Sequence, residues 1–261
     1  RVFSGVHEYP ASIATALLVL ALVQWTRRTS PLARVRWQRP VAATLAALAV
    51  LIGVRTVYFW RAQNGQALHA SRNFFGAIRV RDLSTDDGQR YRRFDHGTTM
   101  HGGQYLDERR SRIPAAYYTP ASGVGQAMDV LDALARPRRI GVIGLGAGTF
   151  AAFGRRGDAL TFFEIDPDVI ALSTGTQPLF TYVRDSAAAV DMVAGDGRLL
   201  LEQRQPLGFD LLVMDAFSSD AVPTHLLTAE AMALYATHLR DASSLLAVNV
   251  TNRYLDLHEV V

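Results

Sequence analysis

The sequence contains no cysteine and no lysine. Without cysteine, the 261-residue chain has no disulfide framework, no thiolate zinc site and no cysteine nucleophile. All 27 basic residues are arginine, which excludes Schiff-base catalysis and a P-loop lysine. The formal net charge of +3 is too small to argue for a nucleic-acid partner. The hydrophobic content of 49% excludes a disordered chain, and the length allows one large domain or two small ones.

Charged residues are nearly absent from two stretches close to the N-terminus. Residues 9–26 carry no charge, and the apolar run from Pro40 to Trp60 carries only Arg55. A helix needs about 20 residues, with a range of roughly 17–25, to cross the hydrocarbon core of a bilayer. We therefore predict a membrane region over residues 1–61, with transmembrane helices at about 9–26 and 40–60. A pair of buried Ala/Leu helices in a soluble protein is the alternative.

The next segment, residues 62–121, has the pattern of a linker followed by a small β region. Residues 62–75 form a polar connection, and strands are predicted at 76–83 and 90–95, on either side of a Thr-Asp-Asp-Gly turn. A His-Gly-Gly run at 101–103 is expected to interrupt the segment that follows. The predicted β region therefore contains one hairpin.

Residues 122–261 alternate regularly between predicted strands and helices. The strands are predicted at 139–143, 159–165, 190–194, 209–215 and 244–250. The helices are predicted at 122–136, 151–155, 168–172, 196–202 and 228–239. Strands that alternate with helices indicate an α/β fold, here a Rossmann-like, doubly wound parallel sheet. Because open sheets of this type commonly have further strands, we expect the chain to be truncated at its C-terminus.

Three glycines, Gly144, Gly146 and Gly148, form a G-x-G-x-G turn after the first strand of this domain. Glycines let the backbone approach a ligand closely, and the N-terminus of a helix follows. The spacing differs from the dinucleotide pattern G-x-G-x-x-G, because the third glycine comes one residue early. On its own, the motif is also compatible with a bare turn.

Three carboxylates strengthen the case for a ligand at the same edge of the sheet. Glu164, Asp196 and Asp215 end the second, third and fourth predicted strands. Ligands of open α/β sheets bind outside the carboxyl ends of the strands, and a carboxylate that follows the second strand can accept hydrogen bonds from ribose hydroxyls. We therefore predict a nucleoside site. For Asp196 alone, a role as a helix cap is a credible alternative.

Several motifs together resemble the spermidine synthases, which are aminopropyltransferases on a methyltransferase-like fold. The motifs are GVIGLGAGT at 141–149, EIDP at 164–167, GDGR at 195–198 and DAFSSD at 215–220, with HGTTMHGGQ at 96–104 and PAAYY at 114–118 upstream. The runs SSDAVPTHLLT at 218–228 and NRYLDL at 252–257 are similar to a bacterial subgroup in which this domain follows membrane helices. The resemblance covers roughly residues 76–261.

The resemblance implies a role for each residue of the site. Asp215 is expected to be the catalytic carboxylate. The residues expected to bind the nucleoside of the donor are Gly144, Gly146, Gly148, Glu164, Asp196 and Gly197. The residues expected to bind the amine substrate are Gln104, Tyr117, Tyr118 and Asp220. No metal site is expected.

The implied reaction moves an aminopropyl group from decarboxylated S-adenosylmethionine to a polyamine such as putrescine and releases methylthioadenosine. The donor, or S-adenosylmethionine in its place, is a co-substrate, and no permanently bound cofactor is expected. A polyamine is protonated at neutral pH, so a nearby carboxylate is needed to attract the cation and accept its proton.

Two other functions stay open because the chain departs from the family pattern. Ala147 stands where these enzymes usually carry an acid for the donor's ammonium group, and no acid follows Tyr117 and Tyr118 in the amine pocket. One alternative is a methyltransferase that uses S-adenosylmethionine. The other is a non-catalytic nucleoside-binding domain that regulates a membrane module.

The expected partners are a small polyamine and the membrane, with no nucleic acid, and the sequence leaves a homodimer open. Residues 27–39 contain five arginines and no acid, and the positive-inside rule places such a loop in the cytoplasm. If both helices span, the domain after Trp60 lies outside, yet S-adenosyl donors are made in the cytosol. We predict an inner-membrane protein with a cytoplasmic catalytic domain. The first segment then does not span, or helices outside this chain override the rule.

Overall fold

The computed structural model describes residues 8–26, 38–65, 67–97, 99–216 and 223–249. The chain divides into two compact units, residues 1–72 and 73–261. The first unit contains α1 (Glu8–Thr26), α2 (Gln38–Asn64) and the strand β1 (Ala67–Arg72). The second unit contains the remaining strands and helices.

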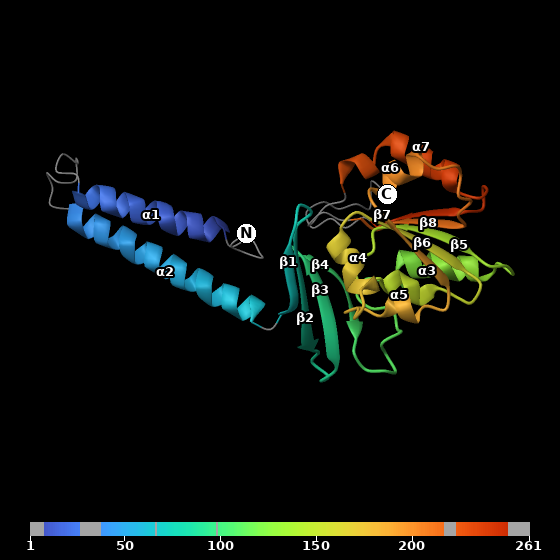
Figure 1. Ribbon diagram of the computed structural model, residues 1–261, viewed down its shortest axis with the longest axis horizontal. Coiled ribbons are helices and arrows are strands. Elements are labelled where there is room, and N and C mark those ends of the chain that lie inside the picture. The colour runs from blue at the N-terminus through green and yellow to red at the C-terminus, as the bar shows by residue number, and fades with distance from the viewer. Residues whose placement is uncertain (1–7, 27–37, 66, 98, 217–222, 250–261) are drawn as a thin grey trace. The chain divides into compact units, whose positions relative to one another are not determined.

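The segments Tyr9–Thr26 of α1 and Arg39–Arg61 of α2 are each long and apolar enough to cross a membrane. The two helices pack side by side (Figure 1). Their buried residues are small and recur at intervals of seven: Ala14 and Ala21 in α1, and Ala42, Ala49 and Thr56 in α2. Large apolar side chains are exposed instead, among them Leu18, Leu22, Leu51 and Val54. Small residues at the contact and large ones outside are typical of helices that pair in a bilayer, because small residues let the backbones approach.

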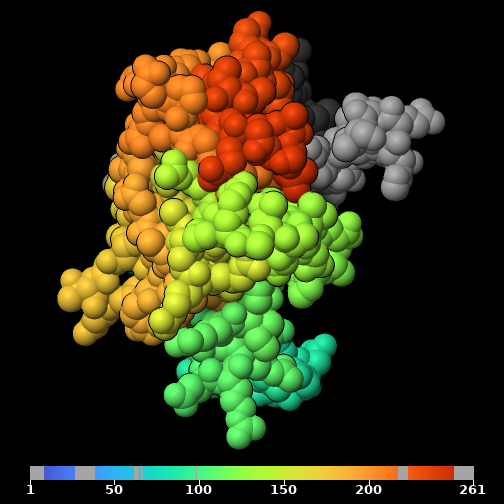
Figure 2. All heavy atoms as spheres, turned by 90° about the vertical axis from the view of Figure 1, so that its right-hand side faces the viewer, coloured from blue at the N-terminus to red at the C-terminus, as the bar shows by residue number. Residues whose placement is uncertain are grey.

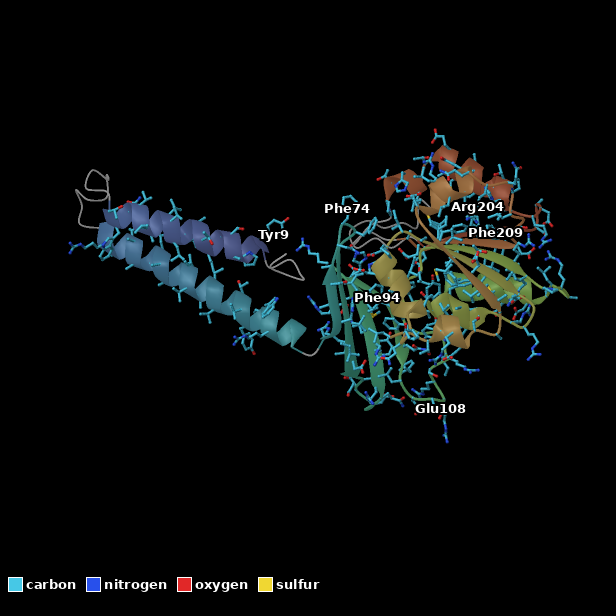
Figure 3. The ribbon with its side chains drawn as sticks, viewed as in Figure 1. Tyr9, Phe74, Phe94, Glu108, Arg204 and Phe209 are labelled. Carbon is cyan, nitrogen blue, oxygen red and sulfur yellow. The ribbon has the colours of Figure 1, made fainter. Side chains whose placement is uncertain are left out.

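An antiparallel sheet of β2 (Ala77–Ser84), β3 (Arg90–His96) and β4 (Thr99–Tyr105) opens the second unit. Its apolar side chains Ile78, Val80 and Phe94 belong to the same buried core as the parallel sheet, and Figure 3 labels Phe94 on β3. The hairpin of β2 and β3 confirms the sequence prediction. The strand β1 was not predicted, because residues 62–75 lack an alternating apolar pattern.

The predicted interruption at 101–103 is wrong, because β4 runs through it. A Cβ atom at Gly102 would lie 2.9 Å from the Cβ of Ala147, and one at Gly103 would overlap the hydroxyl of Tyr91. The two glycines therefore give neighbouring groups room to approach the strand, and they do not end it.

The described residues form a five-stranded parallel sheet in the order β7-β6-β5-β8-β9. The strands are β5 (Arg139–Ile143), β6 (Ala159–Glu164), β7 (Ala189–Ala194), β8 (Leu211–Met214) and β9 (Leu245–Val248). This sheet confirms the predicted Rossmann-like, doubly wound fold. Strand order reverses at β5, because β6 and β7 lie to one side of it and β8 and β9 to the other.

Helices cover both faces of the parallel sheet (Figure 1). They are α3 (Gly123–Asp132), α4 (Pro167–Thr174), α5 (Tyr182–Asp185), α6 (Gly197–Glu202) and α7 (Ala229–His238), with 3₁₀ turns at Thr149–Phe153 and Thr224–Leu226. Four of the five helices begin at a side-chain cap, provided by Ser122, Asp166, Asp196 and Thr228. The helix predicted at 151–155 is instead the 3₁₀ turn Thr149–Phe153.

Alternate side chains of each central strand enter two separate cores, as the period of two in a strand requires. In β8, Leu211 and Val213 pack in the core beneath α3, α4 and α5, whereas Leu212 and Met214 pack in the core beneath α6 and α7. Figure 2 shows α7 (red) above and α3 (yellow-green) below on one side of this unit. Both sheet faces are therefore buried, and the carboxyl ends of the strands remain as the edge where polar groups gather.

Candidate active site

A cavity of about 290 Å³ lies at the carboxyl ends of β5, β6 and β8. It adjoins the reversal of strand order at β5, which is the usual ligand position of an open α/β sheet. The side chains and backbone that line it come from the turns after these strands, from the antiparallel sheet and the segment before it, from the segment before α3, from α4 and from Pro223. The lining residues are Phe74, Phe75, Phe94, His96, His101, Tyr117, Gly144, Leu145, Gly146, Glu164, Ile165, Asp166, Val169, Asp215, Ala216 and Pro223.

The glycine turn brings two strand ends and β4 together. Gly144 has φ of +97°, and a Cβ atom there would clash with the backbone carbonyl of Asp215. Gly146 has φ of +55°, and a Cβ atom there would lie 2.7 Å from the carbonyl oxygen of His101. Both positions therefore combine a backbone conformation that favours glycine with a close backbone approach. Gly148, with φ of +75°, precedes the 3₁₀ turn and does not line the cavity.

Glu164 ends β6 inside the cavity and is only 8% exposed. Its Oε2 accepts a hydrogen bond from the Leu145 N–H (2.8 Å), and its Oε1 accepts one from the Asp166 N–H (2.9 Å). Burial raises the pKa of this carboxyl, and the two backbone donors oppose that shift. Each carboxylate oxygen has two acceptor sites, so one on each oxygen remains for hydroxyl groups of a ligand.

Asp215 follows β8 and is held by three side chains. Its Oδ2 accepts hydrogen bonds from the hydroxyls of Tyr117 (3.0 Å) and Tyr118, and its Oδ1 accepts one from the Asn249 side-chain amide (2.6 Å). The two hydroxyls fill the acceptor sites of Oδ2, whereas Oδ1 keeps one. A proton arriving at this carboxylate would therefore be accepted at Oδ1.

Burial raises the pKa of Asp215 to about 6, although the hydrogen bonds from Tyr118, Asn249 and Tyr117 pull it down. Burial also raises the pKa of Tyr117 and Tyr118 well above the ordinary tyrosine value, and the neighbouring carboxylate adds to both shifts. The two phenols therefore stay protonated as donors near neutral pH. A carboxyl with a pKa close to the working pH is suited to general acid–base catalysis.

The charges around the cavity favour a cationic ligand. Three carboxylates line it, those of Glu164, Asp166 and Asp215, and no arginine is among its described lining residues. His96 and His101 are the other ionisable groups of the lining besides Tyr117, and their rings lie 5.5 Å apart. Among the described residues, no group of three or more His, Cys, Asp or Glu side chains is arranged to hold a metal ion.

Comparisons with known proteins bear on this fold. No protein-family model matches the sequence, and no curated protein matches it. A spermidine synthase in complex with the transition-state analogue AdoDATO aligns with a TM-score of 0.50 at 16% identity, over 67% of this chain and 55% of that one. The fold is spermidine synthase-like.

Two further solved structures are similar at lower TM-scores. The spermidine synthase from Thermotoga maritima aligns with a TM-score of 0.47 at 16% identity, over 67% of this chain and 54% of that one. A probable spermidine synthase from Corynebacterium glutamicum ATCC 13032 aligns with a TM-score of 0.48 at 19% identity, over 66% of this chain and 60% of that one. The chain thus spans little more than half of the length of the spermidine synthases it resembles.

Within this spermidine synthase-like fold, two predicted site residues line the cavity beside the glycine turn and Glu164. They are Tyr117 and Asp215, which contact each other. Tyr118 also donates to Asp215, but its ring lines a second hollow between α3 and β9. Asp220 lies outside the described residues.

Gln104 does not line the cavity. It is buried in β4, where its side-chain amide donates to the carbonyl of Ser111 (2.7 Å) and the hydroxyl of Thr181 (2.8 Å) and accepts from the Thr181 N–H (2.9 Å). These bonds join β4 to the start of α5. The structure thus gives Gln104 a position within the scaffold, and its predicted contact with substrate stays a prediction.

Asp196 and Gly197 follow β7 and lie outside the cavity lining. Asp196 caps α6 through the Leu199 N–H (3.0 Å), and its other carboxylate oxygen lies 2.8 Å from the Nε2 of His225. Gly197 packs against Ile143, whose Cγ2 would lie 2.7 Å from an added Cβ. Helix capping is thus the observed role of Asp196, and a contact of this pair with adenine stays a prediction.

Asn249, Phe74 and Phe75 are among the residues of the site that were not predicted from the sequence. Asn249 follows β9, whose predicted span gives no sign that this amide reaches Asp215. Phe74 and Phe75 belong to the segment that was predicted to be a polar connection. The aromatic pair itself, within a run of polar residues, was the available signal for a functional loop.

Proposed function

We propose that this chain is a transferase that acts on an S-adenosyl sulfonium donor, and that it moves an aminopropyl group to an amine. The observation that carries the proposal is Asp215, a buried carboxylate whose pKa is raised to about 6, in a cavity with no arginine among its described lining residues. The spermidine synthase-like fold supports the choice of reaction, and one spermidine synthase of this fold has been solved in complex with the transition-state analogue AdoDATO.

The proposed reaction uses three features of this chain. Glu164 holds the ribose of the donor, and the glycine turn at 144–148 lies against the nucleoside and sulfonium. The carboxylate of Asp215 attracts the ammonium form of the acceptor and takes one proton at Oδ1. The freed nitrogen then attacks the carbon next to sulfur. The new C–N bond replaces the C–S bond, whose electron pair stays on sulfur and gives neutral methylthioadenosine.

The experiment that tests this function is a two-by-two assay with detection of products by mass. The full chain is supplied with S-adenosylmethionine or its decarboxylated form, each with and without putrescine. Release of methylthioadenosine and formation of an aminopropylated amine, only with the decarboxylated donor and putrescine together, support the proposal. Methylation of an acceptor with S-adenosylmethionine would contradict it.

Methyl transfer from S-adenosylmethionine is the second candidate function, and one observation favours it. Ala147 is 1% exposed and faces Gly102 of β4, outside the cavity lining. Alanine carries no charged group, so this turn has no carboxylate to bind the ammonium group of a decarboxylated donor. The same assay separates the two candidates, because only methyl transfer requires the carboxylated donor.

The pH dependence of the reaction should follow Asp215. A general base works when it is ionised, so below its pKa of about 6 the active fraction should fall about tenfold per pH unit. We expect kcat/KM for the donor to rise with pH through about 6 and then level off. The sulfonium charge is permanent and does not titrate. A profile that is flat across this range would contradict the assignment of Asp215 as the base.

For the location, we propose that the two apolar helices anchor the chain in the inner membrane with the second unit in the cytoplasm, where S-adenosyl donors are made. A reporter fused after Val261 tests the orientation. We expect green fluorescence from a fused fluorescent protein and no activity from a fused alkaline phosphatase. Active phosphatase with silent fluorescence would place the domain in the periplasm and overturn the proposal.

A further inference from the structure

One aromatic ring at the cavity is almost wholly exposed. Phe74 lines the cavity but is 92% exposed, and its ring meets that of Phe75 edge-on at 5.4 Å. Figure 3 labels Phe74 at the end of the antiparallel sheet. A phenylalanine in this position contributes little to folding, because burial of its ring is what stabilises a protein. A ligand that covers the ring would gain that burial.

The backbone that carries Phe74 is held firmly, so the exposed ring is not part of a loose loop. The side-chain oxygen of Asn73 accepts hydrogen bonds from the backbone N–H groups of Phe75 (2.8 Å) and Gly76 (3.2 Å). The Asn73 N–H donates to the Gly76 carbonyl (2.9 Å), which closes the turn. His96 packs where a Cβ of Gly76 would stand, and its Nε2 lies 3.1 Å from the Phe75 carbonyl oxygen.

The same asparagine ties this turn to the acidic segment after β6. Its side-chain nitrogen donates to Oδ1 of Asp166 (2.6 Å) and to Oδ2 of Asp168 (3.1 Å). Two carboxylates that would repel each other thus share one amide donor. Asp166, which accepts a hydrogen bond from Asn73, lies two residues after Glu164. Asn73 therefore holds its neighbour Phe74 at the end of the cavity where Glu164 lies.

We propose that Phe74 stacks on the heteroaromatic base of the nucleoside ligand, and that Asn73 is the residue that positions it. The inference rests on the proposed function, in which Glu164 holds the ribose. The base is bonded to that ribose, so it lies at the same end of the cavity, away from Asp215. Ile165, which is 43% exposed and also lines the cavity, offers a second apolar surface there.

The first test measures binding of 5′-methylthioadenosine to the full chain in detergent by calorimetry. Removing one aromatic ring that stacks on a base typically weakens binding by about 10-fold or more, so Phe74→Ala should weaken this probe by about that factor. Methylthioribose, which lacks the base, should bind Phe74→Ala and wild type alike. The matched control is Ile113→Ala, a 48% exposed side chain outside the cavity lining, which should leave both probes unaffected.

A second measurement tests Asn73 with a readout that general loss of stability would not reproduce. The emission of the tryptophan added by Phe74→Trp is obtained by subtracting the wild-type emission. Methylthioadenosine should change this emission in Phe74→Trp and should leave it unchanged in Ile113→Trp. Adding Asn73→Ala to Phe74→Trp should reduce the emission change at saturating probe. An unchanged amplitude would overturn the positioning role.

The outcomes separate this inference from the proposed function. If wild type binds methylthioadenosine and Phe74→Ala binds it equally well, the stacking inference is wrong and the proposed function stands. If the loss in Phe74→Ala is the same for methylthioribose, the ring contacts the sugar or sulfur and the inference is wrong in the same way. If wild type binds no methylthioadenosine, the proposed function fails, and this inference fails with it.

Discussion

Asp215→Asn should lower turnover about 10²–10⁴-fold, the usual contribution of a positioned general base. An amide in place of the carboxylate cannot accept the proton of the amine, and it removes the negative charge that attracts the ammonium form. Single-turnover measurement of methylthioadenosine release, with decarboxylated donor and putrescine at saturation, gives the effect on the chemical step.

The Asn variant should keep its fold, because its neighbours can adapt. The oxygen of the new amide can still accept from the hydroxyls of Tyr117 and Tyr118, and a turn of the Asn249 amide about its axis lets its own oxygen accept from the new nitrogen. Methylthioadenosine binding and thermal unfolding should therefore stay near their wild-type values. Turnover of the Asn variant at the wild-type rate would mean that Asp215 is structural.

A control variant at Tyr118 separates the charge of Asp215 from its surroundings. Tyr118→Phe removes one donor to Oδ2 and leaves the carboxylate in place. Because that hydrogen bond lowers the pKa of Asp215, its loss should move the pH dependence of kcat/KM toward higher pH. Asp215→Asn should abolish this pH dependence instead of moving it. A common effect of both variants would point to general damage to the cavity.

The parallel sheet could be predicted from the sequence because its strands and the turns that follow them each have a local sequence pattern. The predicted strand at 139–143 is followed by the glycine turn, and in the structure β5 ends at Ile143 and Gly144 approaches the backbone of Asp215. The acid at the end of β6 was found from its place after a strand. Such features are determined by the few residues on either side of them in the sequence.

Residues whose environment is made by distant segments were not predicted in the same way. Gln104 was predicted to bind substrate because it belongs to a motif typical of spermidine synthases. In the structure its side chain bonds to Thr181, which lies far along the chain at the start of α5. Asn249, the residue after β9, contacts Asp215, and nothing in the sequence around it shows that the ends of β8 and β9 meet. For Asp196, one short pattern fits both a ligand contact and a helix cap, and the structure shows the cap.

The hydrogen bonds of Asn73 to Asp166 and Asp168 are a clearer example of an environment that the local sequence does not show. A polar segment with a pair of phenylalanines has no strand or helix period, so pattern analysis gives it no structure. Its conformation depends on Asp166 and Asp168, which belong to the cap and first turn of α4. The two segments meet only in the folded chain, and their contact places the exposed ring of Phe74 at the cavity.

Glu164→Gln should weaken binding of methylthioadenosine by about 10–150-fold, which corresponds to the loss of a charge-assisted interaction of about 1.5–3 kcal/mol. In wild type, each oxygen of Glu164 keeps an acceptor site for one ribose hydroxyl. The glutamine nitrogen accepts no hydrogen bond, and it would face the N–H of Leu145 or of Asp166, which now donate to the carboxylate. Calorimetry on the full chain measures the loss.

The variant also loses one backbone hydrogen bond, so weaker binding alone does not prove a contact with ribose. A 2′,3′-dideoxy analogue of methylthioadenosine resolves this, because it lacks the two hydroxyls. Wild type should bind the analogue much more weakly than the parent compound, whereas Glu164→Gln should bind the two with nearly equal affinity. The exposed Glu202→Gln, whose wild-type side chain pairs with Arg198 on α6, should retain the wild-type difference. If Glu164→Gln still prefers the hydroxylated compound as strongly as wild type does, Glu164 holds the glycine turn in place and does not bind the ribose.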